Sequence, residues 1–193
     1  MSILNIVKYP DPVLAHVAEP VGKVTNEVRL LINDMIDTMY SADGVGLAAP
    51  QVGLSLRIFV VDAGDGPQEF INPHIILQEG EQTGVEGCLS LPGLHGDVTC
   101  SSRVVVRATN RRGRIMTYAG EGLWARAIQH ENNHLNGKLF VDNVIPGTAR
   151  WFTGAEDAEG NYIETPTTVE EALRLFRDAG DQVATSCLVR GRS

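Results

Sequence analysis

The feature that most constrains the chain is the run Gln129-His130-Glu131-Asn132-Asn133-His134, which contains the pattern H-E-x-x-H. On a helix, residues four apart lie on one face, so both imidazoles can bind a single metal ion. The intervening carboxylate, Glu131, is placed to take a proton from water held by that metal. The surrounding pattern predicts a helix from about Glu121 to Leu135, with Gly137 at the position just past its end.

Two imidazoles do not complete a catalytic site, because a catalytic divalent metal takes three protein ligands and keeps one position open. The third ligand must come from another segment. The candidates are Cys88, Cys100, His74, His95 and nearby carboxylates. The small Gly87 before Cys88 allows a close approach of the backbone. A lone cysteine is usually a small buried hydrophobe, but this interpretation of Cys88 weakens beside an H-E-x-x-H motif. The histidines outside the motif are interpreted as ordinary polar or partly buried side chains, with His95 bordering a substrate cleft.

Length and charge exclude several classes of protein. A chain of 193 residues suits one domain, and folding buries roughly 70% of its surface without help from disulfides. The formal net charge of -8 argues against a broad nucleic-acid surface. Three cysteines do not make a disulfide framework, the N-terminal residues lack the apolar run of a signal peptide, and no apolar run approaches the roughly 18 residues of a membrane span. We therefore expect a protein of a reducing cytoplasm.

Periodicity predicts short strands mixed with a few helices. An amphipathic stripe predicts a helix over Asn26–Tyr40, and a capping box at Thr168 predicts a short third helix over about 168–179. Strands are expected at Arg57–Asp62, in short pieces around Pro73 within Glu69–Leu77, and in a hairpin of Arg103–Thr109 with Ile115–Ala119. Residues 146–167 are expected to be loop. Without a βαβ repeat, the layout predicts an α+β fold.

Three segments of the chain, in order, resemble the three signatures of the peptide deformylases. They are Gly44–Gln51 (GVGLAAPQ), Glu86–Ser90 (EGCLS) and Gln129–Gly137 (QHENNHLNG). The early DPVL at Asp11–Leu14 and the late LFVD at Leu139–Asp142 fit the same family. The resemblance covers about residues 3–145. It implies a catalytic domain over 1–146 with antiparallel strands around a central metal-binding helix, and a C-terminal extension over 147–193 that is part of the same domain or an appendage.

The resemblance also implies roles for individual residues. The metal ligands would be Cys88, His130 and His134, and the catalytic groups would be Glu131, the Gln51 side-chain amide and the Leu89 backbone N–H. The substrate-binding residues would be Gly44, Val45, Gly46, Gly87, Arg126 and Ala127. The metal expected in the cell is Fe²⁺, with Zn²⁺, Ni²⁺ or Co²⁺ able to substitute. The implied reaction removes the formyl group from the N-terminal formyl-methionine of nascent proteins, and an association with the ribosome is a further expectation.

Three departures from the family pattern carry expectations of their own. Asn133 stands where the family usually has Asp, which removes a charge near the second histidine ligand. Cys100 stands where an Arg usually pairs with the motif glutamate, here Glu86, and Arg103 is the nearest replacement in sequence. Arg126 lies one turn before His130, where an apolar residue usually lines the pocket. Its guanidinium is expected either to weaken the preference for formyl-methionine or to swing outward.

Other functions remain open at this point. An altered pocket could select a different N-formyl or N-acyl compound. A closed structural site could use Cys88, Cys100, His130 and His134, leaving Glu131 without a purpose. An inactive relative that only binds is a further alternative. A metalloprotease is disfavoured, because no third zinc-ligand pattern follows His134.

Overall fold

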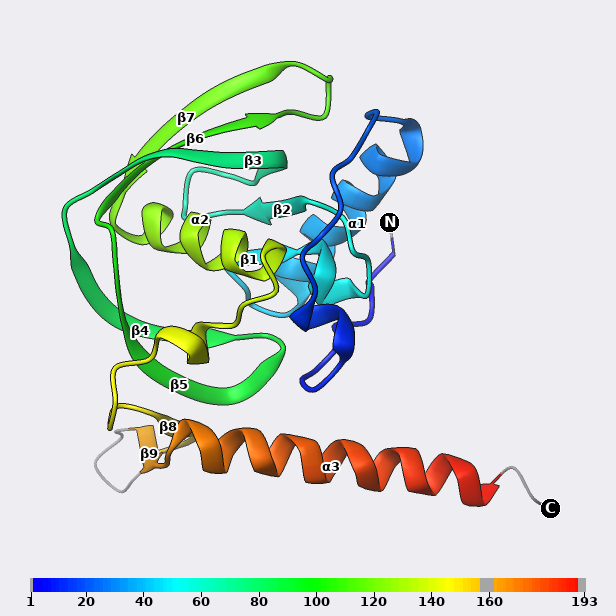
Figure 1. The fold of residues 1–193 in the computed structure, drawn as a ribbon, viewed down its shortest axis with the longest axis vertical. Helices are drawn as coiled ribbons and strands as arrows, with labels where there is room; N and C mark the ends of the chain where they lie inside the picture. Colours follow the sequence, from blue (N-terminus) through cyan, green and yellow to red (C-terminus); the bar gives the residue numbers. More distant parts are fainter. Residues whose placement is uncertain (1, 157–161, 191–193) are drawn as a thin grey trace.

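The structure, a computed structural model, describes the backbone of residues 2–156 and 162–190 and the side chains of 2–152 and 163–179. Figure 1 shows its helices and strands. The helices are α1 (Asn26–Ser41), α2 (Gly122–Leu135) and α3 (Val169–Arg190), with short 3-10 turns at Pro12–Ala15, Ala49–Val52 and Phe140–Asn143. The strands are β1 (Gly46–Ala48), β2 (Ile58–Val61), β3 (Gln68–Glu79), β4 (Gln82–Cys88), β5 (Leu91–Cys100), β6 (Arg103–Thr109), β7 (Ile115–Glu121), β8 (Arg150–Glu156) and β9 (Tyr162–Pro166).

The first sheet has five antiparallel strands in the order β1-β2-β3-β6-β7. Its strand β2 is buried on both faces, because α1 packs on one side and α2 on the other (Figure 1). Ile58 and Val60 face α1, and Phe59 and Val61 face α2. Burial on both faces explains why this strand reads as a continuous apolar run rather than an alternating one.

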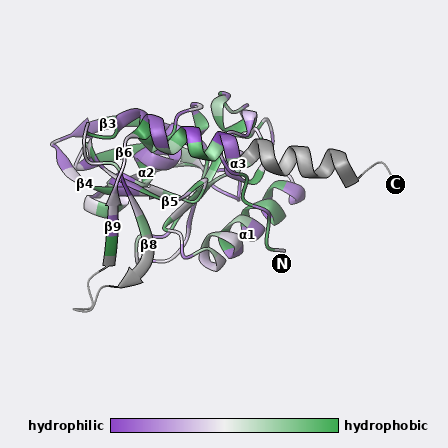
Figure 2. Cartoon of the chain, turned by 90° about the horizontal axis from the view of Figure 1, so that it is seen from below, coloured by the Kyte–Doolittle hydropathy of each residue, from purple (hydrophilic) through white to green (hydrophobic). Residues whose placement is uncertain are grey.

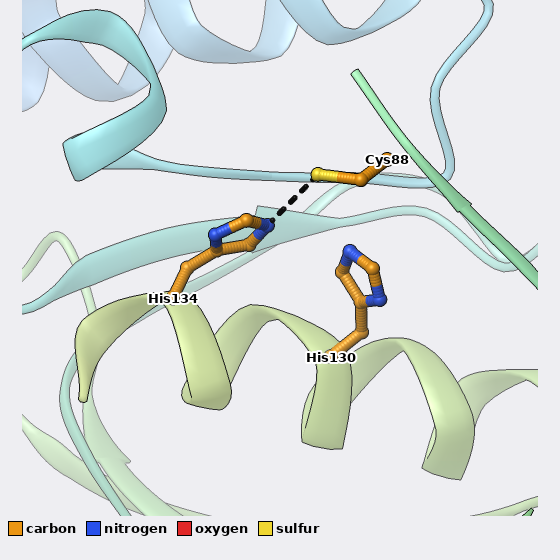
Figure 3. A group of neighbouring side chains, drawn as sticks. All are labelled: Cys88, His130 and His134. Carbon is orange, nitrogen blue, oxygen red and sulfur yellow. Dashed lines mark hydrogen bonds between the residues drawn. The ribbon is translucent and has the colours of Figure 1, made fainter. Parts of the chain in front are cut away.

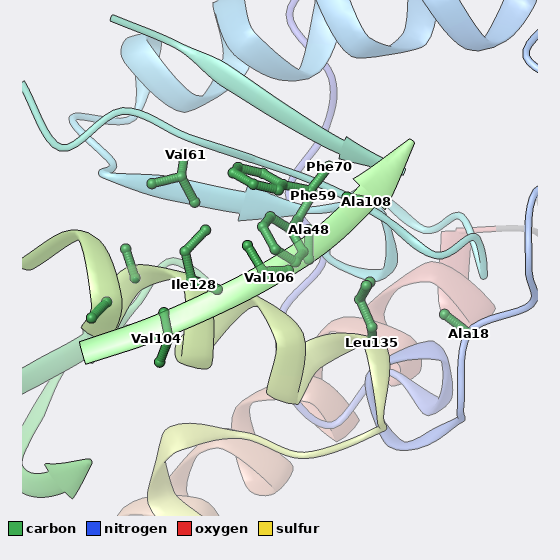
Figure 4. Close-up of a cluster of buried hydrophobic side chains, with 12 residues drawn as sticks. Ala18, Ala48, Phe59, Val61, Phe70, Val104, Val106, Ala108, Ile128 and Leu135 are labelled. Carbon is green, nitrogen blue, oxygen red and sulfur yellow. The ribbon is translucent and has the colours of Figure 1, made fainter. Parts of the chain in front are cut away.

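Helix α2 lies in the main core, where Ile128 and Leu135 pack against Phe59 and Phe70 of the first sheet (Figure 4). The prediction of this helix over about 121–135 is confirmed within one residue. Helix α1 is confirmed as well, and the Thr25 hydroxyl caps it by accepting a hydrogen bond from the Val28 N–H. The two helices therefore fix the first sheet between them, with the H-E-x-x-H residues on the side of α2 that faces the second sheet.

The second sheet has the order β4-β5-β8-β9, and its strands β4 and β5 were not predicted. Glycines at 84, 87, 93 and 96 and Pro92 interrupt the apolar alternation that signals a strand. The short strands expected around Pro73 are a single long strand, β3, with a register shift next to Asn72, whose φ is 50°. That irregularity accommodates Pro73, which has no N–H to give to the ladder.

The prediction of a loop over 146–167 was wrong, because Arg150–Glu156 and Tyr162–Pro166 form β8 and β9. Residues 157–161, within the predicted loop, lie outside the described residues. The third helix is also longer than predicted: it continues past Gly180 to Arg190. A glycine costs a helix only about 1 kcal/mol relative to alanine, so one glycine does not stop it.

Helix α3 lies along the outside of β5 and β8 (Figures 1 and 2). Its residues Ala172, Leu173 and Phe176 pack with Leu94 and Trp151 in a second apolar cluster that also contains Cys88. The C-terminal segment thus buttresses the strands that lead to the cysteine motif. Across the parts of the chain that the structure describes, no helix combines the length and apolarity needed to cross a membrane.

Candidate metal centre

The structure brings the three predicted ligands together. Cys88 ends β4, and His130 and His134 lie one turn apart on α2, with their side chains converging in Figure 3. One ligand atom from each residue lies within 4.8 Å of the others, and the Cys88 Sγ lies 3.3 Å from the His134 Nε2. Cys88 and His134 are buried, and the His130 side chain is 12% exposed.

The electrostatics of this cluster suit a metal cation. Burial by itself raises the pKa of the Cys88 thiol, but the imidazoles of His134 and His130 outweigh it and hold that pKa well below its usual range. For His130, burial opposes protonation, but Cys88 and Glu86 raise its pKa well above the usual value. In the metal-free cluster, the thiolate form of Cys88 and the protonated form of His130 therefore stabilise each other. A divalent cation that displaces the proton of the His130 ring would be bound by a thiolate and two neutral imidazoles. This donor set fits iron or zinc.

Glu131 lies beside the cluster and is 4% exposed. Its Oε2 is buried and has no hydrogen-bond partner among the described residues. Its Oε1 lies against the Cα of Gly46, where a Cβ would overlap it. Burial raises the pKa of this carboxyl to about 7, although His130 and His134 act to lower it. An orphaned, buried carboxylate oxygen next to three metal-ligating atoms is arranged to meet water at a metal.

Glu86 connects two charged groups behind the cluster. One of its oxygens accepts from the His130 Nδ1 at 2.8 Å, which leaves the His130 Nε2 free to bind a metal. The other accepts from the Arg126 guanidinium at 2.7 Å. The expectation that Arg103 replaces the missing partner of Glu86 was wrong, because Arg103 pairs with Glu79 and Glu121 on the surface.

Arg126 is 8% exposed, and both terminal nitrogens of its guanidinium donate hydrogen bonds. Besides Glu86, the guanidinium donates to the Val98 carbonyl at 3.0 Å and to the Gln82 carbonyl at 3.3 Å. Gly84 leaves room for it, since a Cβ there would lie 3.3 Å from the Arg126 Nη2. Arg126 does line the cleft, but its charge is directed at Glu86 rather than at a substrate side chain. The swing into solvent that was the alternative is excluded by the same contacts.

Two other predicted residues take different positions. Cys100 lies near the Arg126–Glu86 pair and is not among the three residues grouped as metal ligands within the described chain. The closed site with two cysteines therefore has no geometric support. Asn133 makes no side-chain hydrogen bond with any described residue, and the buried His134 Nδ1 also lacks a partner there. Within the described residues, no hydrogen bond therefore joins the Asn133 side chain to the ring of His134.

The predicted oxyanion donors also lie at the cluster. The Gln51 side chain is 1% exposed, its Oε1 accepts from the Ala48 N–H at 2.8 Å, and its Nε2 lies 3.5 Å from the Cys88 Sγ. The Ala48 bond fixes the amide so that its N–H₂ end faces the metal ligands. Leu89 follows Cys88 directly, and its carbonyl accepts from the Lys8 Nζ at 2.6 Å. A role for Lys8 was not predicted from the sequence, in which its only distinguishing feature is its position directly before Tyr9-Pro10.

A cleft of about 560 Å³ leads to the cluster. Its lining includes all of the predicted substrate-binding residues, namely Gly44, Val45, Gly46, Gly87, Arg126 and Ala127. Cys88, His130 and Glu131 lie at its base. A second, more polar cavity of about 700 Å³ lies behind α2, but Cys88, Glu131 and His134 do not line it. The chemistry therefore belongs to the smaller cleft.

Comparison with known proteins agrees with this site. A family model described as polypeptide deformylase matches residues 3–150, which hold every residue of the cluster and the cleft. The chain belongs to the polypeptide deformylase family. Among relatives of the family, a peptide deformylase of Desulfitobacterium hafniense is 51% identical over 75% of this chain and 96% of that protein. A peptide deformylase 1 of Bacillus anthracis is 53% identical over 75% of this chain and 94% of its own length.

Solved structures of the polypeptide deformylase family share the fold. The peptide deformylase of Thermotoga maritima is 44% identical, with a TM-score of 0.74, and the match covers 76% of this chain and all (100%) of that one. The Synechococcus elongatus enzyme, solved in complex with actinonin, is 43% identical with a TM-score of 0.72, over 74% of this chain and 79% of that chain. The family match ends at residue 150, so most of β8 and all of β9 and α3 lie beyond it.

Proposed function

We propose that this chain is a metal-dependent hydrolase that removes the formyl group from the N-terminal formyl-methionine of peptides and nascent proteins. One observation carries the proposal: Cys88, His130 and His134 lie together, and two of them line a cleft. The Glu131 carboxylate also lines this cleft, and its Oε2 has no partner among the described residues. The family supports it, because relatives at about half sequence identity are named peptide deformylases.

A divalent metal held by Cys88, His130 and His134 supplies Lewis acidity, which acidifies water and polarises the formyl carbonyl. Glu131 then moves the protons. In the metal-free cluster burial raises the pKa of this carboxyl to about 7. Beside a bound metal, the carboxylate can accept a proton from water and return it to the leaving amine. The Glu131 Oε2 is buried and has no partner among the residues that the structure describes, which suits it to this role.

The negative charge that develops on the formyl oxygen needs donors. We assign them to the Gln51 side-chain N–H₂ and the Leu89 backbone N–H. The Gln51 amide is preorganised by the hydrogen bond from the Ala48 N–H, so no rotation is needed as charge develops. The Lys8 ammonium holds the Leu89 carbonyl and so restrains the same stretch of backbone.

The substrate backbone is accommodated by Gly44, Val45 and Gly46 on one wall and by Gly87 on the other. The backbone of these residues is placed to pair with an extended substrate as an added strand, while the missing Cβ atoms at Gly46 and Gly87 leave room for the Glu131 and His95 side chains. Because the Arg126 charge is compensated by Glu86, an apolar methionine side chain does not face an unpaired cation there. This favours formyl-methionine over the alternative of a polar formyl or acyl compound.

We propose Fe²⁺ as the metal in the cell, with Zn²⁺, Ni²⁺ or Co²⁺ able to replace it. A thiolate with two imidazoles suits iron and zinc alike, so the ligands do not choose between them. The cytoplasmic location and the association with the ribosome stay predictions.

The test is formate release. Protein loaded without oxygen with Fe²⁺ or with Zn²⁺ is assayed on formyl-Met-Ala-Ser, acetyl-Met-Ala-Ser and a formyl-amino compound that is not a peptide. We expect the formyl peptide to be the best substrate with iron bound. A metal-loaded protein that leaves the formyl peptide intact but cleaves the acetyl peptide or the non-peptide compound would contradict the proposal.

A further inference from the structure

Three consecutive residues near the start of the chain bind two distant parts of the backbone. The Val7 N–H donates to the Gln51 carbonyl at 2.9 Å, and the Tyr9 N–H donates to the Ser90 carbonyl at 3.0 Å. Gln51 lies in the second 3-10 turn, and Ser90 lies in the turn that connects β4 to β5. Residues 7–9, the N-terminal brace, thus join the two places from which the proposed oxyanion donors come.

The middle residue of the N-terminal brace reaches the β4–β5 turn with its side chain. The Lys8 Nζ donates to the Leu89 carbonyl at 2.6 Å. The turn has two residues, Leu89 and Ser90, and the β4–β5 ladder pairs Cys88 with Leu91 on either side of it. The central peptide of such a turn can face either way, which is the difference between type I and type II turns. An ammonium on its carbonyl oxygen selects one orientation.

The same turn also contacts the second proposed donor. The Gln51 Nε2 lies 3.5 Å from the Ser90 Oγ, and Ser90 is 0% exposed. A rotation of the turn would therefore change the placement of the Leu89 N–H relative to the Gln51 amide. Donors stabilise an oxyanion strongly only when they are already aimed at the place where its charge develops. The orientation of this turn thus bears directly on the rate of the chemical step.

The C-terminal helix holds the N-terminal brace from the outside. The Arg177 Nη1 of α3 donates to the Tyr9 hydroxyl at 2.8 Å, and the Arg177 guanidinium lies 5.9 Å from the centre of the Tyr9 ring. Tyr9, Leu173 and Phe176 also pack against the same buried apolar cluster. Because Tyr9 adjoins Lys8, the brace must break these contacts with α3 before it can withdraw from the turn.

We propose that Lys8 is a positioning residue for the oxyanion donors: its ammonium holds the Leu89 carbonyl and thereby keeps the Leu89 N–H aligned with the Gln51 amide. The inference rests on the proposed function. Backbone N–H groups make the other two contacts of the N-terminal brace, so any residue except proline could supply them. The contact to Leu89 needs a long side chain that ends in a donor. Lys8 therefore acts through Leu89 and does not bind the substrate.

The experiment measures kcat and KM for formyl-Met-Ala-Ser with the metal-loaded full chain. Lys8→Met keeps the apolar stem of the side chain and removes the donor. We expect kcat to fall about tenfold, the effect of one hydrogen bond, with KM unchanged. Lys8→Arg, which keeps a cationic donor, should recover most of kcat. Lys23→Met is the matched control, because Lys23 is exposed, does not line the cleft and carries the same charge.

The outcomes are separable. Metal-loaded wild type that releases no formate contradicts the proposed function, and the role of Lys8 falls with it. Active wild type with an equal kcat in Lys8→Met overturns the role of Lys8 alone. A rise in KM without a fall in kcat would assign Lys8 to substrate binding, and a loss of metal would assign it to the metal centre, so either result also overturns the proposal.

The two companion variants decide whether the donor or the charge matters. Lys8→Arg that is no more active than Lys8→Met would overturn the proposal, because a donor at this position would then have no effect. An equal fall of kcat in Lys23→Met would overturn it as well, because the loss would follow from net charge. The unfolding temperature of each variant establishes that it has folded.

Discussion

The Arg126 guanidinium on α2 and the Glu86 carboxylate on β4 form a buried ion pair, with the Nη1 and Oε1 atoms 2.7 Å apart. The pair joins the helix that carries two of the proposed metal ligands to the strand that carries the third. Because the other Glu86 oxygen accepts from the His130 Nδ1, the pair also fixes the orientation of one ligand ring. Arg126 is therefore a positioning residue for the metal centre.

Removal of this cation should destabilise the protein. Arg126→Met leaves Glu86 buried with one charge partner fewer, a change that costs about 3–5 kcal/mol in comparable buried pairs. The free energy of unfolding of the metal-loaded protein, measured in urea, checks this value. The double variant Arg126→Met/Glu86→Gln should be more stable than Arg126→Met, because it removes the unpaired charge. Equal stability of the single and double variants would show that the pair is not coupled.

A methyl group at position 46 should disable the enzyme without removing its metal. A Cβ in Gly46→Ala overlaps the Glu131 Oε1, so the carboxylate must move. A displaced general base costs on the order of a hundredfold in kcat. Metal content and formate release are measured together, with Gly22→Ala as the control, since a Cβ at Gly22 meets nothing within 4 Å. Full activity of Gly46→Ala would mean that Glu131 does not work from this position.

The stability of the metal-free protein should depend on pH through Glu131. Burial raises the pKa of this carboxyl from 4.5 to about 7 in the folded state. The folded protein therefore binds the proton more tightly than the unfolded chain does. The associated stability is fully present below about pH 4.5 and is lost as the pH rises through 7. The shift corresponds to about 3 kcal/mol at 1.36 kcal/mol per pKa unit.

Glu131→Gln provides the reference for that measurement, because it cannot ionise. The free energies of unfolding of metal-free wild type and Glu131→Gln are compared from pH 4.5 to pH 8. The wild type should lose about 3 kcal/mol relative to the variant over this range. Parallel curves would show that Glu131 is not buried as a high-pKa acid.

The two described cysteines should differ in their effect on metal binding. Cys88→Ser replaces a thiolate ligand by a hydroxyl and should weaken metal affinity sharply. Cys100→Ser should keep one metal per chain, because Cys100 lies outside the ligand group found in the described residues. Metal analysis after dialysis against a competing chelator distinguishes them. Loss of metal from Cys100→Ser would favour the closed site with two cysteines.

The local parts of this fold could be predicted from sequence, and the non-local parts could not. The stripe of Asn26–Ser41 and the run Ile58–Val61 have periodicities that depend only on neighbouring residues. The strands β4 and β8 lack such a pattern. Glycines interrupt the apolar alternation of β4. Strand β8 forms by pairing with β5, which is far away in the sequence. Their stability comes from tertiary contacts that override local propensity.

The site divides in the same way. The ligands and Glu131 are found in short motifs, so their positions in sequence indicate their chemistry. The partner of Glu86 lies 40 residues away on another element, and sequence proximity therefore pointed to Arg103 instead. The sequence also does not show in which direction the Arg126 guanidinium points. Only the packing of α2 against β4 and β5 turns it away from the substrate and toward Glu86.

We propose above all that Glu131 moves protons at a metal held by Cys88, His130 and His134. Its most direct test is formate release from formyl-Met-Ala-Ser by iron-loaded Glu131→Gln, with the bound metal quantified in the same sample. We predict a full complement of metal and a loss of kcat on the order of a hundredfold or more. Turnover at the wild-type rate by the metal-loaded variant would contradict the account.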